Sequence, residues 1–190
     1  MSRILRKSIK FNPNNLSIKV DSDCVMISSF LNATKCIKVK KPDLIDVVVE
    51  DGSLLIRPYV KPGHAMYKKL TSLSASLMRI ISSSLISILE DFSMTLKFSG
   101  VGYKVEKKMS DSMLLFFCGK SHPIMLCIPS DIDVSFPSQG SILLKGIDKP
   151  KVTQFAALVR DVKRVEPYKG KGFSFDGEFI IRKEAKTGKK

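Results

Sequence analysis

One pattern that occurs twice along the chain limits the fold more than any other feature: several short strand-like segments, then one stretch with apolar residues at helical spacing. In the first copy, β-branched and other apolar residues between turn residues predict strands at Ser17–Val20, Cys24–Ser28, Lys35–Val39, Leu44–Val49 and Ser53–Arg57. Asp51-Gly52 is typical of a hairpin turn. After Lys61-Pro62-Gly63 the period changes, and apolar residues recur at steps of three and four from Met66 to Ile88, which predicts a helix.

The second copy has the same order. Strands are expected at Met94–Ser99, Tyr103–Lys107, Met113–Phe117, Pro123–Ile128, Asp133–Phe136 and Ile142–Lys145. A helix is expected from Lys149 to Val165, with Asp148 as its N-cap and an end before Pro167. Its apolar side is formed by Val152, Phe155, Ala156, Val159 and Val162.

Strands joined by short turns form antiparallel sheets, and an amphipathic helix buries its apolar side on one sheet face. We therefore predict an α+β fold of two tandem duplicated domains, each an antiparallel sheet with one helix packed on a face. The expected limits are 1–90 for the N-terminal domain and 91–165 for the C-terminal domain. Residues 166–190 are expected to be a basic C-terminal extension that continues the second domain.

The charge of the chain favours a polyanionic partner. Lys and Arg number 32 against 18 Asp and Glu, a net charge of +14, which suits nucleic acid or an anionic membrane better than a small neutral substrate. The most apolar stretch, Leu77 to Leu89, contains Arg79 and several serines, so no membrane span is expected. The start, Met1 to Lys7, is basic but lacks the apolar segment and cleavage site of a secretory signal. We predict no membrane partner and no export.

Residues with chemical reactivity are few. Cys24, Cys36, Cys118 and Cys127 form no Cys-x-x-Cys pair, and their apolar or strand-like settings predict reduced core thiols in a reducing compartment. Neither His64 nor His122 has a Cys or His partner at the spacing of metal ligands. A hydrolase that uses His122 and a neighbouring serine stays open, because triads are assembled in space, but no Gly-x-Ser-x-Gly elbow supports it.

A glycine pair also argues against a bound cofactor. Gly100-Val101-Gly102 lacks the third glycine of a dinucleotide-binding loop, since Val105 stands at that position. We interpret the pair as a place where strands bend or approach another backbone. The sequence thus predicts no catalytic residue, no metal, no cofactor and no small-molecule substrate.

The segment from Pro167 to Phe173, with the sequence Pro-Tyr-Lys-Gly-Lys-Gly-Phe, combines three features of phosphate-binding loops. Its glycines allow positive φ and close backbone approach, and Lys169 and Lys171 supply point charges. Tyr168 and Phe173 either stack on bases or anchor the loop in the protein. The alternative is a flexible, solvated loop whose charges only keep the chain soluble.

The amino terminus is a second basic segment. The first twenty residues contain five basic side chains and no acidic one: Arg3, Arg6, Lys7, Lys10 and Lys19. These charges suit contact with RNA, and also simple solubility.

Five short motifs occur in the order, and at roughly the spacing, of one ribosomal protein family. They are Gly100-Val101-Gly102-Tyr103-Lys104, Gly119-Lys120-Ser121-His122-Pro123, Lys145-Gly146-Ile147-Asp148-Lys149, Ala156-Ala157-Leu158-Val159-Arg160 and Glu166-Pro167-Tyr168-Lys169-Gly170-Lys171-Gly172. Through them the chain resembles the bacterial-type large-subunit ribosomal protein number six family, best from about Leu96 to the end. It departs from the family pattern at Val165, where proline is usual, and at Phe173, where an aliphatic residue is usual.

The resemblance implies a structural constituent of the large ribosomal subunit and no enzyme. It implies binding to large-subunit rRNA near the sarcin-ricin loop and the base of the factor-binding stalk, beside neighbouring large-subunit ribosomal proteins. In that family the carboxy-terminal half and its tail supply most RNA contacts. The rRNA-binding residues implied here are Tyr168, Lys169, Gly170, Lys171 and Gly172, with Lys104, Lys145 and Lys149 as additions.

The resemblance also implies a location on the ribosome, in a bacterial cytoplasm or an organelle matrix. Many Lys, Ile, Ser and Asn residues indicate an AT-rich coding genome, which is found in reduced bacteria and in organelles alike. A free-standing basic RNA-binding protein or RNA chaperone is the alternative function, since it would need the same surplus of positive charge.

Overall fold

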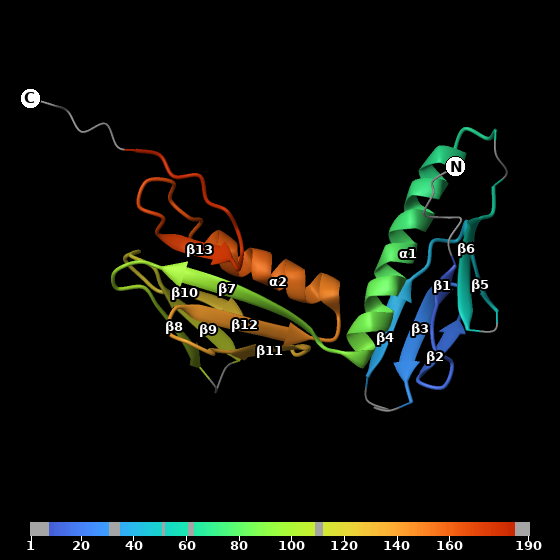
Figure 1. The fold of residues 1–190 in the computed structure, drawn as a ribbon, viewed down its shortest axis with the longest axis horizontal. Coiled ribbons are helices and arrows are strands. Elements are labelled where there is room, and N and C mark those ends of the chain that lie inside the picture. The colour runs from blue at the N-terminus through green and yellow to red at the C-terminus, as the bar shows by residue number, and fades with distance from the viewer. Residues whose placement is uncertain (1–7, 31–34, 51, 61–62, 109–111, 185–190) are drawn as a thin grey trace, which may run out of the picture. The chain divides into compact units, whose positions relative to one another are not determined.

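A computed structural model describes residues 8–30, 35–50, 52–60, 63–108 and 112–184. The chain forms two compact units, Met1–Asp91 and Phe92–Lys190. Each unit contains antiparallel sheets and one helix (Figure 1), so the predicted α+β class and duplicated layout are confirmed.

The first unit consists of two three-stranded antiparallel sheets and a helix. The elements are β1 (Ile9–Lys10), β2 (Leu16–Val20), β3 (Cys24–Ser29), β4 (Cys36–Lys40), β5 (Ile45–Glu50), β6 (Ser53–Pro58) and α1 (Tyr67–Leu89). The strand orders are β1-β6-β5 and β2-β3-β4, and α1 packs against β3, β4 and β6. Alternate residues of the strands are buried, as Ile37 and Val39 are in β4, because successive side chains of a strand point to opposite faces.

Helix α1 needs a correction to the sequence argument about membranes. With 23 residues and a mean hydropathy of 1.5 in its most apolar window, it is long and apolar enough to cross a bilayer by these two measures. One side of the helix, however, is buried in the first unit, through Leu70, Leu77, Ile81, Leu85 and Ile88. These contacts with the sheets are those of a core helix in a globular unit.

The second unit repeats this arrangement and adds one strand. Its elements are β7 (Phe92–Ser99), β8 (Lys104–Lys108), β9 (Met113–Phe117), β10 (Ile124–Cys127), β11 (Ile132–Ser135), β12 (Ser141–Gly146), α2 (Lys149–Val162) and β13 (Gly172–Phe175). The sheets are β11-β12-β7-β13 and β10-β9-β8, and α2 packs against β7, β12 and β13. The core lies between α2 and the sheets, with Leu96, Phe116, Leu144, Phe155 and Phe173 among its buried side chains.

The strand orders show the duplication directly. The order β1-β6-β5 in the first unit corresponds to β7-β12-β11 in the second, and β2-β3-β4 corresponds to β8-β9-β10. In both units the helix follows the last strand of this set. Strand β13, which pairs with β7, has no counterpart in the first unit among the described residues.

The sequence patterns missed two strands and extended one helix too far. Strand β1 has only two residues, so it shows no alternation, and β13 begins with a glycine in a Lys/Gly-rich segment. Helix α2 ends at Val162 and not at Val165, because Arg164 leaves the helix to bridge Phe173 of β13. Tertiary pairing here overrides local helix propensity.

The predicted core position of the cysteines is wrong for two of them. All four thiols are free, but only Cys118 is buried, whereas Cys36 and Cys127 are exposed and Cys24 is intermediate. Several predicted features lie outside the described residues: Asp51 of the hairpin turn, Lys61-Pro62, and the basic residues Arg3, Arg6 and Lys7.

Candidate nucleic-acid interface

The loop at residues 163–171 joins α2 to β13 and is held by backbone hydrogen bonds. The amide of Phe173 donates to the carbonyl of Lys163 (2.9 Å), and the amide of Glu166 donates to the carbonyl of Lys171 (2.8 Å). Inside the loop, Gly170 N–H donates to Glu166 C=O at 2.9 Å. The Ser99 hydroxyl, at the end of β7, donates to Gly170 C=O at 2.8 Å. The loop therefore has a fixed conformation built on the edge of the sheet.

The chain itself explains why Gly172 lacks a side chain. Its φ is +139°, and a Cβ there would lie 2.7 Å from the carbonyl oxygen of Arg164 and 2.7 Å from Cα of Val165. Gly170 has φ +68°, a left-handed conformation that glycine adopts readily. The close approach at Gly172 lies within the protein, where the segment after α2 runs beside β13.

The two aromatic residues of the segment have different surroundings. Phe173 is buried, with its ring centroid 5.4 Å from that of Phe98 and 5.6 Å from that of Phe116. Of the two possibilities that the sequence left open, Phe173 thus anchors the loop. Tyr168 is 52% exposed and stands in the turn of the loop. Its ring is available for stacking.

The chain after β13 folds back onto the loop. The amide of Lys183 donates to the carbonyl of Pro167 at 3.0 Å, and the guanidinium of Arg182 lies beside Gly170. Glu178 holds the start of this segment: it accepts a hydrogen bond from the Phe175 amide (3.0 Å) and pairs with Arg160 of α2. Two parts of the chain that are eleven or more residues apart therefore meet at one surface.

This meeting produces a group of unpaired positive charges, which we call the basic cluster: Lys169, Lys171, Arg182 and Lys183. In the part of the chain that the structure describes, no carboxylate lies within ion-pair distance of any of them. Nearby Arg164 and Lys97 are instead paired, with Asp161 (2.8 Å) and Asp176 (2.7 Å). The basic cluster thus carries charge that the described residues do not neutralise.

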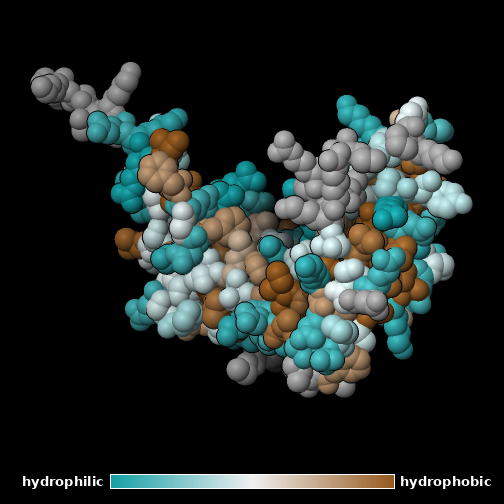
Figure 2. All heavy atoms as spheres, turned by 45° about the vertical axis from the view of Figure 1, so that its right-hand side comes forward, coloured by the Kyte–Doolittle hydropathy of each residue, from teal (hydrophilic) through white to brown (hydrophobic). Residues whose placement is uncertain are grey.

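The surface of this segment also carries apolar side chains. Figure 2 shows hydrophilic (teal) side chains over most of the C-terminal segment, with hydrophobic (brown) ones exposed close to the grey end of the chain. Phe179 and Ile181 are exposed in this segment.

The sequence predicts a basic C-terminal extension that contains Arg182 and Lys183, but it does not predict that they lie beside the 163–171 loop. The two residues are more than ten positions from Lys169 in the sequence, so no local pattern indicates that their segment contacts the loop. The signal that was present, a basic tail directly after the glycine-rich loop, gives no information on where the tail folds. The hydrogen bond from the Lys183 amide to the Pro167 carbonyl, and the position of Arg182 beside Gly170, reveal it.

The three additional lysines lie in two places. Lys104 begins β8, after a short turn from Ser99, and so stands at the same end of β7 as the loop; it pairs with Glu106. Lys145 lies opposite Ser93 at the other end of β7, whereas Gly172 lies opposite Ser99. Six strand residues separate these positions by roughly 20 Å. Lys149 is at that far end too, with its Nζ 5.2 Å from the Phe92 ring centroid.

Burial and two nearby charges act on the pKa of the Cys118 thiol in opposite directions. Cys118 is buried before the β9–β10 turn, and burial raises the pKa of its thiol, while the charges of Lys120 and Lys163 act to lower that pKa. Neither lysine was among the predicted site residues.

The histidines show no catalytic arrangement. Ser121 Oγ lies 3.4 Å from Nδ1 of His122, and both side chains are exposed on the β9–β10 turn. Within the described ranges, no carboxylate bonds to His122, and no three His, Cys, Asp or Glu side chains gather as a metal site. The hydrolase alternative therefore gains no support from the geometry.

Comparison with known proteins identifies the family. Residues 99–176 match the family described as "Ribosomal protein L6". Over its whole length the chain is 34% identical to the large ribosomal subunit protein uL6 of Dictyoglomus turgidum and 33% identical to that of Halalkalibacterium halodurans, covering 100% of both. The chain belongs to this family. It is also 29% identical to the large ribosomal subunit protein uL6c of Guillardia theta, again over 100% of both chains.

Membership of this family indicates the general role of the chain. The chain has a structural role in the large ribosomal subunit, and its location is the ribosome. The matched range includes the β7–β8 turn, α2, the 163–171 loop and β13, and therefore most of the surface described above.

Proposed function

We propose that the chain binds large-subunit rRNA through the loop end of its second unit, near the sarcin-ricin loop and the base of the factor-binding stalk, beside neighbouring ribosomal proteins. The observation that carries this proposal is the basic cluster: four cations without an acidic partner in the described residues, on a loop with fixed geometry. Tyr168, Lys169, Gly170 and Lys171 form the main contact, while Gly172, which is buried, lets the segment after α2 run beside β13. It is a structural function, without catalysis.

Phosphate contact is the mechanism. Lys169 and Lys171 act as point charges, and Arg182 presents a planar fork that suits phosphate oxygens. Each neutralised phosphate releases counterions, so the affinity falls with salt. Contact with roughly six to ten phosphates gives a log–log salt slope of about −4 to −9. Because phosphate contacts carry no base information, this part of the surface fixes position and not sequence.

The test compares two double variants that remove the same charge. Lys169→Ala with Lys171→Ala should weaken binding to large-subunit rRNA and reduce the salt slope by about one unit for each lost contact. Lys38→Ala with Lys40→Ala is the matched control, because both side chains are exposed on β4 of the first unit. Equal losses in the two double variants would mean that net charge, and not this loop, determines binding.

Lys104, Lys145 and Lys149 are proposed as further phosphate contacts. Lys145 and Lys149 lie at the far end of β7, so they would touch a different stretch of rRNA from the loop. Lys145→Ala with Lys149→Ala should lower the slope independently of the loop variant, and the two effects should add. An unchanged slope would remove this pair from the interface.

A free-standing RNA chaperone is separated from the ribosomal role by sedimentation. Stable co-migration with large subunits at moderate salt is the expected result. A pool that stays off the subunits and acts on arbitrary RNA would contradict the proposal.

A further inference from the structure

A cleft in the second unit has Lys104, one of the proposed phosphate contacts, in its lining, and its other lining residues take no part in those contacts. It lies between the start of β8 and the turn from β11 to β12, with a volume of about 490 Å³. Its lining includes Phe98 of β7, Val105 of β8, and Phe136 and Gln139 of the turn. A volume of this size is typical of sites that hold a small organic group.

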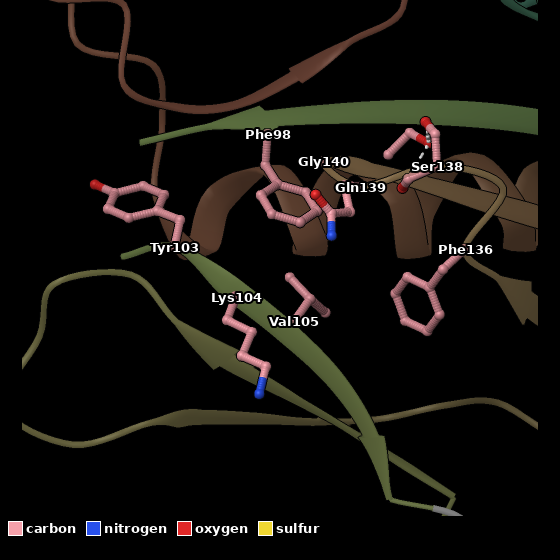
Figure 3. Close-up of a pocket in the computed structure, with 9 residues that line it drawn as sticks. Phe98, Tyr103, Lys104, Val105, Phe136, Ser138, Gln139 and Gly140 are labelled. Atoms are coloured by element: carbon pink, nitrogen blue, oxygen red, sulfur yellow. Dashed lines mark hydrogen bonds between the residues drawn. The ribbon is translucent and has the colours of Figure 1, made fainter. Parts of the chain in front are cut away.

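The walls of the cleft are aromatic and apolar. Figure 3 shows the side chains of Phe98, Val105 and Phe136 around one open space, while the amide of Gln139 reaches toward it from the turn and Lys104 stands at one side. Phe136 is 41% exposed, so its ring is accessible. Flat aromatic walls suit a flat ring, because offset or edge-to-face contacts between rings are favourable.

The turn that carries Gln139 is held in place before anything binds. The amide of Phe98 donates to the carbonyl of Gly140 at 2.8 Å, and the amide of Ser141 donates to the carbonyl of Ser138 at 3.1 Å. The hydroxyls of Ser138 and Ser141 are 2.7 Å apart. The side-chain amide of Gln139 has no hydrogen-bond partner among the described residues. It offers a donor and an acceptor side by side.

We propose that this cleft binds one unstacked base of the rRNA, with the base against the ring of Phe136 and its edge on the amide of Gln139. The inference rests on the proposed function, because Lys104 and the cleft stand at the same end of β7 as the basic cluster. Unstacked bases are recognised by aromatic stacking and by hydrogen bonds to their edges. Lys104 is placed to meet the phosphate of the same nucleotide, because its exposed pair with Glu106 contributes little and can exchange.

A nucleotide would use the aromatic walls, the amide of Gln139 and the charge of Lys104 together, whereas an apolar side chain of a neighbouring protein would use only the aromatic walls. A side chain of that kind would make no use of the donor and acceptor of the Gln139 amide, which is exposed to solvent, or of the charge of Lys104. The cleft would therefore provide base recognition, which phosphate contacts cannot supply.

Photo-crosslinking in assembled large subunits tests the proposal. A benzophenone amino acid replaces Phe136 in one variant, and Tyr168 in a second variant that reports on the proposed function. Crosslinks of both probes to rRNA, with the probe at 136 on a single nucleotide, are the expected result. Crosslinks from 168 to rRNA, but from 136 only to protein or to nothing, would overturn the cleft proposal alone. Failure of both probes to reach rRNA would overturn the proposed function as well.

Affinity provides the second measurement, with full-length large-subunit rRNA as the probe. Phe136→Ala should lower the affinity about 5- to 150-fold, the range for loss of one base–aromatic stack, without changing the salt slope. Phe117→Ala is the control, since Phe117 is 38% exposed but lies outside the cleft. An affinity within twofold of the wild type, or an equal loss in the control, would overturn the proposal.

Discussion

The two units have the same strand order but end differently. In the first unit, the sheets β1-β6-β5 and β2-β3-β4 are followed by α1, and the chain then continues into β7, the first strand of the second unit. In the second unit, the chain turns back after α2 and adds β13 to the edge of the sheet beside β7. The 163–171 loop and the basic cluster exist because of this return. A duplicated scaffold thus gained its candidate binding surface from one added strand and the segments on either side of it.

The difference is also visible in the strand that receives the addition. Strand β7 has eight residues and pairs on both sides, with β12 and β13, whereas the corresponding β1 has two residues and pairs with β6 alone among the described strands. A long central strand provides a rigid base, and functional loops are positioned best by rigid elements. The second unit therefore suits the fixed presentation of charge better than the first.

Among the substitutions that test the difference between the two units, Phe173→Ala is expected to have the largest effect. The ring is buried against Phe98 and Phe116, and removal of a buried Phe side chain costs about 3–5 kcal/mol. We expect the second unit to lose amide protection in hydrogen exchange while the first unit keeps its own. Phe179→Ala, at a residue that is 89% exposed, is the matched control and should leave both units unchanged. Equal loss of protection in the two units would show that they are not separate in stability.

The next effect concerns the glycine at the start of β13. Gly172→Ala would place a Cβ 2.7 Å from backbone atoms of Arg164 and Val165, which cannot move aside as a side chain can. Because this clash and the positive φ both disfavour alanine, we expect a loss of about 3 kcal/mol in the free energy of unfolding of the second unit. Gly177→Ala is the control, since Gly177 also has positive φ but no atom within 4 Å of the added Cβ; it should cost about 1 kcal/mol. Equal costs would show that the segment after α2 can shift.

Gly172 also shows what the sequence could and could not predict. The pattern of apolar residues predicted the α+β class, the duplication, both helices and eleven of the strands. It could not predict β13, because the pairing with β7 joins residues that are more than seventy positions apart. The glycines of the loop were expected to allow close approach to RNA, whereas the structure gives Gly172 a close contact inside the protein.

The candidate site was predictable in part. Charge and the glycine-rich loop pointed to Lys169 and Lys171, but the neighbouring positions of Arg182 and Lys183 depend on a chain reversal that leaves no local pattern. Lys145 and Lys149 were grouped with the other site residues because all of them belong to the family motifs. In the fold they lie at the opposite end of β7.

A smaller effect is expected where Glu178 joins the returning segment to α2. Glu178→Gln removes the charge that pairs with Arg160, whose buried Nε has no hydrogen-bond partner among the described residues. We expect a loss of about 1 kcal/mol, since the pair is partly exposed. The amide of Lys183 should exchange faster, because the segment is less well held against Pro167. Glu184→Gln is the control with the same change of charge, at an exposed residue. Unchanged exchange at Lys183 would show that Glu178 does not position the basic cluster.

The smallest effect is on the dependence of stability on pH. In the second unit, hydrogen bonds from Lys151, Arg164 and Lys97 hold the pKa values of Asp131, Asp161 and Asp176 below their ordinary value of 3.8. A carboxyl group whose pKa is lower in the folded state stabilises the fold above its ordinary pKa, and this contribution disappears as the pH falls through the folded-state pKa. Stability of the second unit should thus be level from neutral pH to about 5 and decrease below about 4.

Asp131→Asn isolates one of these contributions. The variant cannot ionise at this position, so it should be slightly less stable than the wild type at neutral pH, by at most about 1 kcal/mol because the pair with Lys151 is exposed. The difference between the two proteins should shrink toward zero as the pH falls, since the wild-type carboxyl is then protonated and no longer pairs. Urea unfolding at several pH values measures this difference. A difference that stays constant with pH would mean that the substituted amide disturbs packing, and that the ion pair does not contribute to the stability of this unit.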